Sequence, residues 1–538
     1  MTDLPLVVEN LSFRYRRRDE LAIENIRFEL HPGQVMLIAG SSGCGKTTLM
    51  RCINGLIPNT YQGEMTGDIR LFGKSVKEMA MAEISQSVGT LLQDPERQIL
   101  GSYVLNEVAF GLESLGLPRE EIIPRVEKAL DRLGILHLRD RETFSASGGE
   151  KQKIALAGVL AMEPKILLLD EPLASLDPAS AHEALLAFRG LADEGYSVMI
   201  VEHRVEDVLA IHPEVAMYID EGKVVYQGDT RGLMQAVDHR RIKLPAEVVI
   251  ERARGMAVMP IEVAPREKSK DDAPLVQFED VRFRYSKELP EVLRDVNFSV
   301  RKGDVIAILG HNGSGKTTLV KHALGLLKPT NGRVTLDGQE TRAMTVAQAA
   351  HTIGYVFQSP TQMLFAPTVE DELSFGPKNL GMNAETITRN VDWAIETVNL
   401  KPELKTPPLA LSFGQQKRIS IAAILAMRSR ILMMDEPTAG QDFWNYTAFM
   451  DSILAMPGFD AIIFITHDLD LALTYANRIL LVHAGQVVAD GTPYDVLRDE
   501  ALLRKCRVLP TSLLRLNLEH YPRLGRFHRA EDLAGLLQ

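Results

Sequence analysis

Two copies of one motif set lie on this sequence in the same order. A glycine-rich segment reads GSSGCGKTT at residues 40–48 and GHNGSGKTT at residues 310–318. The lysines of these segments, Lys46 and Lys316, are 270 positions apart, and the motifs downstream of them repeat at 264 or 265. A period this long, with the order kept, is typical of two homologous domains and not of a solenoid of small units. We therefore expect a covalent pseudo-dimer.

Composition and charge restrict the function classes. Of the 538 residues, 45% are hydrophobic and 24% are charged, which is ordinary for a globular protein. No stretch approaches the ~18 apolar residues of a membrane span, and the N-terminus lacks a signal-peptide pattern, so we expect a cytoplasmic protein. Three cysteines without paired spacing predict neither a disulfide framework nor a structural zinc site. A net charge of −11 argues against broad electrostatic binding to nucleic acid.

Both copies have the same predicted surroundings. Alternating apolar residues predict a β-rich start to each half. Short apolar strands are predicted at residues 35–39 and 305–309, directly before the glycine-rich segments, and a helical pattern follows each one. A helix-prone insert begins after Pro118, where proline and acidic residues suit a helix start.

The predicted domain boundaries follow from the repeat. The charged stretch between Pro265 and Pro274 has no apolar periodicity and indicates a linker. We interpret the C-terminal extension as a packing appendage between the halves. The prediction is a first domain at 1–240, an interdomain linker at 241–274, a second domain at 275–500 and the extension at 501–538.

The glycine-rich segments have the chemistry of phosphate binding. Backbone N–H groups of such a loop converge on phosphate oxygens, and the N-terminus of the following helix adds its positive end. Lys46 and Lys316 supply the point charge. Thr47 and Thr317 follow the lysines directly and are placed to give a hydroxyl to Mg²⁺.

An acidic pair ends a predicted apolar strand in each half. Asp170 and Glu171 follow one strand, and Asp435 and Glu436 follow the other. The first carboxylate of each pair can hold magnesium, while the second faces the γ-phosphate and can orient or deprotonate the attacking water. His203 and His467 follow the next predicted strands, at residues 197–201 and 461–465, where an imidazole could contact the γ-phosphate.

Over residues ~5 to ~495 the chain resembles the ATP-binding-cassette ATPases, because each half also carries that family's signature region, ASGGE at 146–150 and LSFGQ at 411–415. The resemblance implies an α/β fold with two P-loop (RecA-like) nucleotide-binding domains, each with a β-rich and a helical subdomain, arranged head to tail as a pseudo-dimer. It also implies that the signature of one half completes the ATP site of the other half.

The site residues carried over are as follows. Catalysis falls to Glu171, Glu436, His203 and His467. Magnesium binding falls to Thr47, Gln93, Asp170, Thr317, Gln358 and Asp435. ATP binding falls to Tyr15, Gly40, Ser41, Ser42, Gly43, Cys44, Gly45, Lys46, Thr47, Thr48, Ser147, Gly148, Gly149 and Glu150 with the first motif set, and to Tyr285, Gly310, His311, Asn312, Gly313, Ser314, Gly315, Lys316, Thr317, Thr318, Ser412, Phe413, Gly414 and Gln415 with the second. Tyr15 and Tyr285 match the family's adenine-stacking aromatic.

The sequence departs from the family pattern at three signature positions. Phe413 stands where the family usually has glycine, which restricts the backbone there if the position needs φ > 0. Ala146 replaces a leucine and Glu150 a glutamine. We predict two competent sites of unequal rate. Cys44 lies inside the first glycine-rich loop, so we expect thiol reagents to act on that site selectively.

The segments after the two glutamines are similar to those of the energy-coupling-factor importers' ATPases. The second half reads QSPTQMLF at 358–365 and then TVEDE and FGPKNLG, while the first half has a weaker version, QDPERQIL at 93–100. The resemblance implies uptake of a vitamin, a vitamin precursor or a transition-metal ion. It also implies a peripheral location on the cytoplasmic face of the membrane, with two membrane partners: an integral coupling protein and a small substrate-binding protein.

Two other functions remain open at this point. Tandem sugar-importer ATPases have a similar length, but their second phosphate loop has typically lost its lysine, whereas Lys316 is present. Soluble tandem cassettes that act on the ribosome usually have a long, basic, helical linker, whereas the linker predicted here is short and mixed in charge. The transported substrate cannot be read from this chain.

Overall fold

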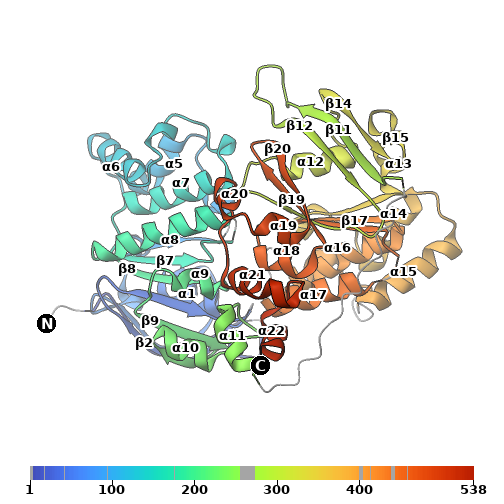
Figure 1. Ribbon diagram of the computed structural model, residues 1–538. Coiled ribbons are helices and arrows are strands. Elements are labelled where there is room, and N and C mark those ends of the chain that lie inside the picture. The colour runs from blue at the N-terminus through green and yellow to red at the C-terminus, as the bar shows by residue number, and fades with distance from the viewer. Residues whose placement is uncertain are drawn as a thin grey trace. The chain divides into compact units, whose positions relative to one another are not determined.

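The computed structural model of the protein describes residues 4–16, 18–41, 43–93, 95–174, 176–254, 273–398, 404–411, 413–437, 443–456 and 458–537. The chain forms two compact units, the first reaching Val248 and the second beginning at Val249. Figure 1 colours the first from blue to green and the second from yellow-green to red. The α/β fold class expected from the motifs is confirmed in both units.

The elements of the first unit alternate between strands and helices. Its strands are β1 (Leu6–Tyr15), β2 (Ile23–Leu30), β3 (Val35–Ala39), β4 (Gly63–Leu71), β5 (Lys74–Ser75), β6 (Val88–Leu91), β7 (Ile166–Asp170), β8 (Ser197–Val201), β9 (Val215–Asp220) and β10 (Lys223–Gly228). Its helices are α1 (Lys46–Ile53), α2 (Leu56–Asn59), α3 (Met81–Ser87), α4 (Pro95–Gln98), α5 (Val104–Ser114), α6 (Arg119–Arg132), α7 (Gly148–Ala161), α8 (Pro178–Asp193), α9 (Val205–Leu209), α10 (Thr230–Ala236) and α11 (Ala246–Ala253), which crosses the boundary between the units.

The second unit repeats this order. Its strands are β11 (Val276–Phe283), β12 (Leu293–Val300), β13 (Val305–Leu309), β14 (Asn331–Leu336), β15 (Gln339–Glu340), β16 (Ile353–Val356), β17 (Ile431–Asp435), β18 (Ala461–Ile465), β19 (Arg478–His483) and β20 (Gln486–Gly491). Its helices are α12 (Lys316–Ala323), α13 (Val346–Ala350), α14 (Val369–Asn379), α15 (Ala384–Val398), α16 (Phe413–Met427), α17 (Phe443–Ala455), α18 (Leu469–Tyr475), α19 (Pro493–Leu497), α20 (Glu500–Lys505), α21 (Ser512–Leu524) and α22 (Ala530–Leu536).

A six-stranded sheet places the motifs of each unit at one edge. In the first unit the strand order is β10-β9-β3-β8-β7-β6, and in the second β20-β19-β13-β18-β17-β16. All neighbours are parallel except β9 with β10 and β19 with β20. Every residue of β3 and β7 is buried, as expected for parallel strands covered on both faces. Because parallel strands end at the same edge, the segments after β3, β7 and β8 meet there.

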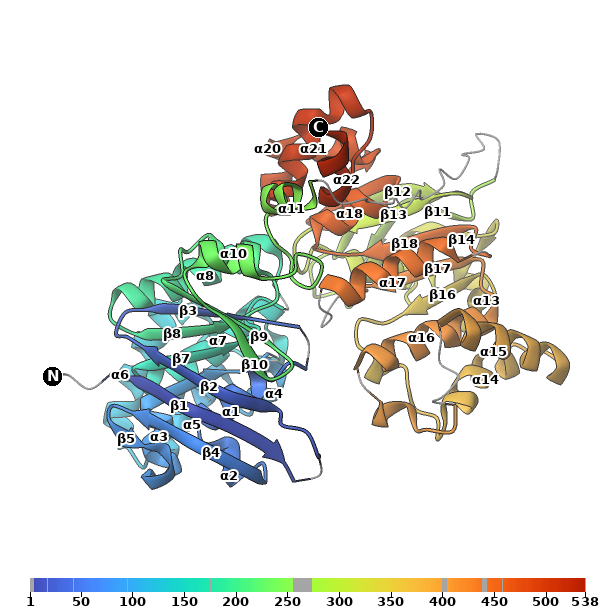
Figure 2. The same cartoon turned by 90° about the horizontal axis from the view of Figure 1, so that it is seen from below.

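A second, antiparallel sheet covers the glycine-rich loop's helix in each unit. The first unit has the order β2-β1-β4-β5, which Figure 2 shows side by side, and the second has β12-β11-β14-β15. Buried and partly exposed residues alternate at the start of β1, which explains the alternation in the sequence. Leu6 and Phe13 of β1 share one buried cluster with Ile38 of β3 and Leu49 of α1.

A helical part is inserted between β6 and β7, and between β16 and β17. In the first unit it contains α5, α6 and α7, which pack against one another (Figure 1), and in the second α14, α15 and α16. Helix α6 begins after Pro118, as the sequence predicts, and buries Ile122, Val126, Ala129 and Leu130. Among the described residues, no helix combines the length and apolar character that a membrane span requires.

Two segments outside the repeat have more structure than their composition suggested. Helix α11 falls inside the segment predicted as linker, so part of that segment is helical, while residues 255–272 lie outside the described residues. The C-terminal extension forms α20, α21 and α22. Thr511 donates a hydrogen bond to Asp470 (2.5 Å), and Arg529 pairs with Asp451 and donates to Tyr475 Oη (2.9 Å). These contacts join the extension to α17 and α18 of the second unit.

Candidate ATP sites

The two glycine-rich loops have the same backbone and lysine geometry. Gly45 and Gly315, each directly before the helix, have φ of 109° and 106°, a left-handed conformation that a side chain would strain. The ammonium of Lys46 donates to the carbonyl oxygens of Gly40 (2.8 Å) and Ser41 (2.9 Å). The ammonium of Lys316 does the same with residues 310 and 311, at 2.8 and 2.9 Å. Each lysine therefore curls over its own loop.

Two of the three predicted magnesium ligands, the threonine and the aspartate, are in contact in each unit. Thr47 Oγ1 donates to Asp170 Oδ2 at 3.2 Å, and Thr317 Oγ1 donates to Asp435 Oδ2 at 3.0 Å. A hydroxyl beside a carboxylate is a hard, all-oxygen donor set of the kind that Mg²⁺ prefers. The residues present therefore fit the ion that the sequence predicts.

Burial affects the two strand-end aspartates in the same direction. It raises the pKa of Asp170 to about 6, assisted by the charge of Glu171 and opposed by the Thr47 hydrogen bond. Burial and Glu436 likewise raise the pKa of Asp435, which also accepts a hydrogen bond from Tyr355 Oη (2.9 Å). A nearby cation would favour the ionised form of both.

The catalytic pair predicted for the first unit is in contact. Glu171 Oε1 lies 2.7 Å from His203 Nε2, and Glu171 Oε2 accepts a hydrogen bond from Gln93 (2.5 Å). Burial opposes the charge of Glu171, but the hydrogen bond and charge of His203, together with Lys46, hold the pKa of this glutamate below its ordinary value. Glu171 is therefore ionised near neutral pH and has the charge that a water-orienting group needs.

The second unit forms the same pair with a different ring nitrogen. Glu436 Oε2 lies 3.0 Å from His467 Nδ1. Burial opposes its charge, while His467 and Lys316 lower the pKa of Glu436 below its ordinary value. Gln358 is exposed, and its main-chain carbonyl accepts a hydrogen bond from the ammonium of Lys417 (3.0 Å). The glutamine that contacts the catalytic carboxylate in the first unit is thus held differently in the second.

Both glutamates predicted to be catalytic have a strained backbone. Glu171 and Glu436 each have φ of 46°, in the left-handed region that disfavours a side chain by about 1 kcal/mol or more. Each is held there by the sheet, since the N–H of Glu171 donates to Val201 (2.9 Å) and that of Glu436 to Ile465 (3.0 Å). The same left-handed backbone recurs at matched positions outside the sites, such as Asn10 and Asp280, so it reflects the repeated fold and is not by itself a mark of function.

The tyrosines predicted to stack on adenine lie beside their loops. Tyr15 Oη is 3.1 Å from Thr48 Oγ1, and Tyr285 Oη is 3.3 Å from Thr318 Oγ1. Tyr285 is 56% exposed, so its ring is open to a ligand. The stacking role itself stays a prediction.

The first signature region caps its helix. Ser147 Oγ accepts the N–H of Glu150 (3.3 Å), and Glu150 Oε2 accepts the N–H of Ser147 (2.7 Å), which together form a capping box at the start of α7. The departure from the family's glutamine therefore keeps the cap. In the second unit α16 begins at Phe413, while Ser412 lies outside the described residues, as does Ser42 of the first loop.

The expectation of selective thiol chemistry at Cys44 is not supported. Its side chain is 5% exposed, with Sγ 3.8 Å from the ammonium of Lys46. Burial raises the pKa of the Cys44 thiol, although Lys46 opposes this. Because the thiolate is the reactive form, the thiol is protected by both its charge state and its position.

Several positions next to the sites were not predicted as functional. Glu202, directly before His203, is buried, and Thr466 occupies the matching position. In the signature helices, Gln152 donates to the carbonyl of Pro172, and the matching Lys417 donates to that of Gln358. Aligning the two halves of the sequence would have shown both differences, because each departs from the repeat.

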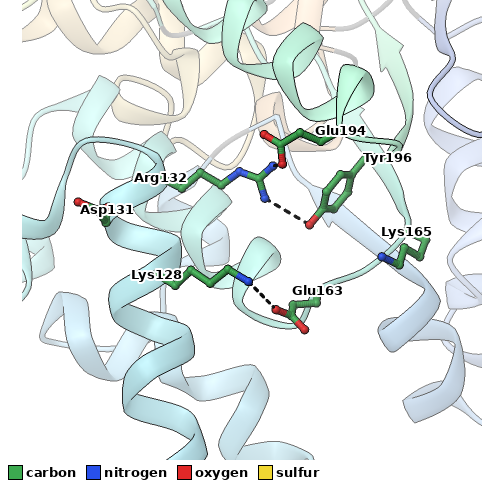
Figure 3. A pocket seen from close by; sticks show the side chains of 7 residues that line it. All are labelled: Lys128, Asp131, Arg132, Glu163, Lys165, Glu194 and Tyr196. Carbon is green, nitrogen blue, oxygen red and sulfur yellow. Dashed lines mark hydrogen bonds and ion pairs between the residues drawn. The ribbon is translucent and has the colours of Figure 1, made fainter.

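A surface depression in the first unit is a poorer candidate. It has a volume of about 510 Å³ and is lined by Lys128, Asp131, Arg132, Glu163, Lys165, Glu194 and Tyr196 (Figure 3). Lys128 pairs with Glu163 (3.2 Å), and Arg132 pairs with Glu194. With three cations facing three carboxylates, the depression has no net charge to attract a phosphate.

The fold, and the motifs that meet at one end of the large sheet in each unit, define a class of protein. It is a chain with two phosphate-loop nucleotide-binding domains that hydrolyses ATP. The family model described as "ABC transporter" matches residues 23–174 and 293–439. The chain belongs to this family.

Relatives of similar length support the assignment. An ABC transporter ATP-binding protein of Bacillus cereus is 34% identical, with 94% of each chain covered. One of Lactobacillus johnsonii is 35% identical, covering 97% of this chain and 96% of the relative. Among solved structures, cbiO1 from Clostridium perfringens, described as part of the ABC transporter complex cbiONQ, is 29% identical with a TM-score of 0.41, covering 49% of this chain and 99% of that one.

Proposed function

We propose that this chain is the ATP-hydrolysing subunit of an energy-coupling-factor importer for a vitamin, a vitamin precursor or a transition-metal ion. Its partners would be an integral membrane coupling protein and a small substrate-binding membrane protein. The chain would lie on the cytoplasmic face of the membrane. The proposal rests on one feature that both units share. Each unit has an exposed apolar side chain in the loop that contains Gln93 or Gln358, which we call the glutamine loop.

A buried glutamate shapes this loop in each unit. Glu107, 8% exposed, accepts the N–H groups of Leu100 (2.7 Å) and Gly101 (2.6 Å). Glu372, 5% exposed, accepts those of Phe365 (2.9 Å) and Ala366 (2.8 Å). Because one buried carboxylate accepts two charge-assisted hydrogen bonds from the loop backbone, the loop has little conformational freedom.

The fixed loops expose the apolar residues. Leu100 is 71% exposed and Phe365 is 61% exposed. Phe110 lies in α5 and is 51% exposed, while Phe375 of α14 is 50% exposed and contacts the Phe365 ring edge-on at 4.7 Å. Apolar side chains held out in a fixed position, in both units, favour an apolar partner over water. A hydrophobic membrane protein fits this surface.

The chemistry proposed for each site follows from its contacts. Lys46 and Lys316 would neutralise the γ-phosphate, and His203 and His467 would hold it. Glu171 and Glu436 would orient the attacking water, which requires the ionised form that their contacts favour.

Magnesium would be held by Thr47, Asp170 and Gln93 with the first loop, and by Thr317, Asp435 and Gln358 with the second. When bound, the ion would neutralise developing charge on the phosphates. By the family's arrangement, ATP binding would close the two units, closure would move the membrane partner, and hydrolysis would reopen them.

Co-purification from native membranes tests the proposal. The tagged chain is extracted in mild detergent and its partners are identified and quantified by mass spectrometry. We expect small hydrophobic integral proteins in stoichiometric amount. Replacing both loop residues, Leu100→Glu with Phe365→Glu, should release them, because a charge on each contact face disfavours an apolar partner.

An equally exposed apolar residue elsewhere provides the control. Leu289 is 52% exposed in the turn between β11 and β12, and Leu289→Glu should keep the partners. Ribosomal proteins in place of membrane proteins would instead make this a soluble ATPase acting in translation. Loss of partners in the control as well would mean that the apolar loops do not carry the interaction.

A further inference from the structure

A buried carboxylate joins the two loops on either side of the first catalytic pair. Glu202, 2% exposed, directly follows β8. Its Oε1 accepts the N–H of Leu173 (2.9 Å), two residues after Glu171, and its Oε2 accepts the N–H groups of His203 (3.0 Å) and Arg204 (3.4 Å). One side chain therefore spans the loop after Glu171 and the loop that carries His203.

The burial of this carboxylate disfavours its charged form. Burial and then the charge of Glu171 raise the pKa of Glu202 to about 7, although Arg204, the N–H of Leu173 and His203 oppose the shift. Glu171, Arg204 and His203 are the charged and titratable groups that face it. A neutral residue would avoid the cost of a buried charge, so packing alone does not account for a glutamate here.

The second unit has a different residue, Thr466, at the position that matches Glu202. Thr466 is fully buried, and its hydroxyl accepts the N–H of Asp468 (3.0 Å) within its own loop. A threonine has one side-chain oxygen close to its own backbone, whereas the two oxygens of a glutamate reach two loops. A buried carboxylate that joins the two loops is therefore present at this position in the first unit, whereas the second unit has a threonine.

We propose that Glu202 is a positioning residue of the first ATP site. It holds the loop after Glu171 and the loop that carries His203 in a fixed position relative to each other. It would fix the 2.7 Å contact between the glutamate and the imidazole. The inference rests on the roles proposed for Glu171 and His203. It does not depend on which membrane partners the chain has.

The test uses the purified full chain with Glu436→Gln, so that turnover reports the first site. In this parent, Glu202→Gln is expected to lower kcat for ATP about tenfold, because misplaced catalytic groups slow the chemical step. KM for ATP should stay within about twofold, since the glutamate does not touch the nucleotide loop. Glu202→Thr, the residue that the second unit carries at this position, should give a similar loss.

A pH series separates positioning from a structural role. Protonated Glu202 and glutamine are close in shape, and each turns one acceptor into a donor group. The ratio of parent to Glu202→Gln rates should therefore approach one as the pH falls below about 7 and grow above it. Glu120→Gln, an exposed carboxylate in α6, provides the control for loss of one charge and should leave the rate unchanged.

Three results would overturn the proposal. These are an unchanged kcat in both Glu202 variants, a rate ratio that is constant with pH, and a rate loss matched by an equal loss of folded protein. A parent without turnover would show instead that the first site is not competent alone, which would refute the roles proposed for Glu171 and His203 as well.

Discussion

Glu171 directly follows β7 and Glu436 directly follows β17, and the two glutamates have the same φ, yet the side chains behind them differ. In the first unit, signature-helix residue Gln152 is bonded to the loop after the catalytic glutamate. In the second, the matching Lys417 is bonded to the glutamine loop, at Phe357 (3.3 Å) and Gln358 (3.0 Å). The reacting groups repeat, and their supports do not.

This difference teaches where the two units can diverge. Thr90 and Tyr355 show it again: Thr90 accepts a hydrogen bond from Asn54, whereas Tyr355 donates to the strand-end aspartate Asp435. The backbone that presents phosphate-binding and catalytic groups is the same in both units. Unequal rates can therefore arise from residues one layer behind the site.

The largest expected effect comes from removing the catalytic carboxylates. Glu171→Gln together with Glu436→Gln should lower ATP turnover by about 10²-fold or more, because no group remains to activate water. Each single variant should retain turnover, at unequal levels. Steady-state phosphate release measures all three. A single variant with wild-type turnover would show that one site is idle.

The next effect concerns the C-terminal extension of the second unit. Arg529→Met leaves Asp451, a largely buried carboxylate, without its cation and should destabilise the second unit by about 3 kcal/mol. Trp393 lies in the second unit, so urea unfolding followed by tryptophan fluorescence in a Trp444→Phe background reports on that unit.

Arg504→Met provides the matched control within the same extension. Arg504 is 72% exposed and pairs with Glu500 one helical turn away, so its loss should change stability little. Equal effects of the two variants would contradict the assigned role of the Arg529 contact.

A smaller, pH-dependent effect is expected for Lys417. Burial lowers its pKa to about 8, so between about pH 8 and 10.5 the unfolded chain binds a proton that the folded chain does not. Wild-type stability should therefore rise relative to Lys417→Gln by up to about 2 kcal/mol between pH 7.5 and 9.5. Trp393 reports this region, since Arg428 after α16 lies over its ring at 3.6 Å. A difference that is independent of pH over this range would mean that folding does not lower the pKa of Lys417.

The smallest expected effect is the reactivity of Cys44. Alkylation of this thiol should be at least about tenfold slower in the native chain than in urea, with or without ATP, because the thiol is buried and its pKa is raised. Mass spectrometry of the modified peptides measures it. Ser314, fully buried at the matching position, allows the comparison: Ser314→Cys should be equally slow. Rapid labelling of one loop alone would reveal a difference between the units in their access to solvent.

Much of the fold could be predicted from the sequence because its signals are local. The strands predicted at 35–39, 305–309 and 461–465 are continuous apolar runs, and the structure has them with these bounds. The convergence of Thr47 and Asp170 also followed, since strand ends at one edge of a parallel sheet must meet.

The supports of the site could not be predicted in the same way. Glu202 is informative only because it is buried and reaches Leu173, and both facts depend on how distant segments pack. Helix α11 was missed because all of residues 241–274 were interpreted as linker, although the charged stretch begins only after Pro265. Cys44 was interpreted from its place in the loop, although its burial decides its reactivity.

The left-handed backbone at Glu171 and Glu436 has a consequence for how such a chain evolves. Asparagine and glycine adopt this conformation more readily than glutamate, so either would relieve strain at both positions. A screen that rewards heat tolerance alone would therefore enrich chains that have lost the water-activating carboxylate. Both glutamates therefore stand against the local conformational preference of the backbone.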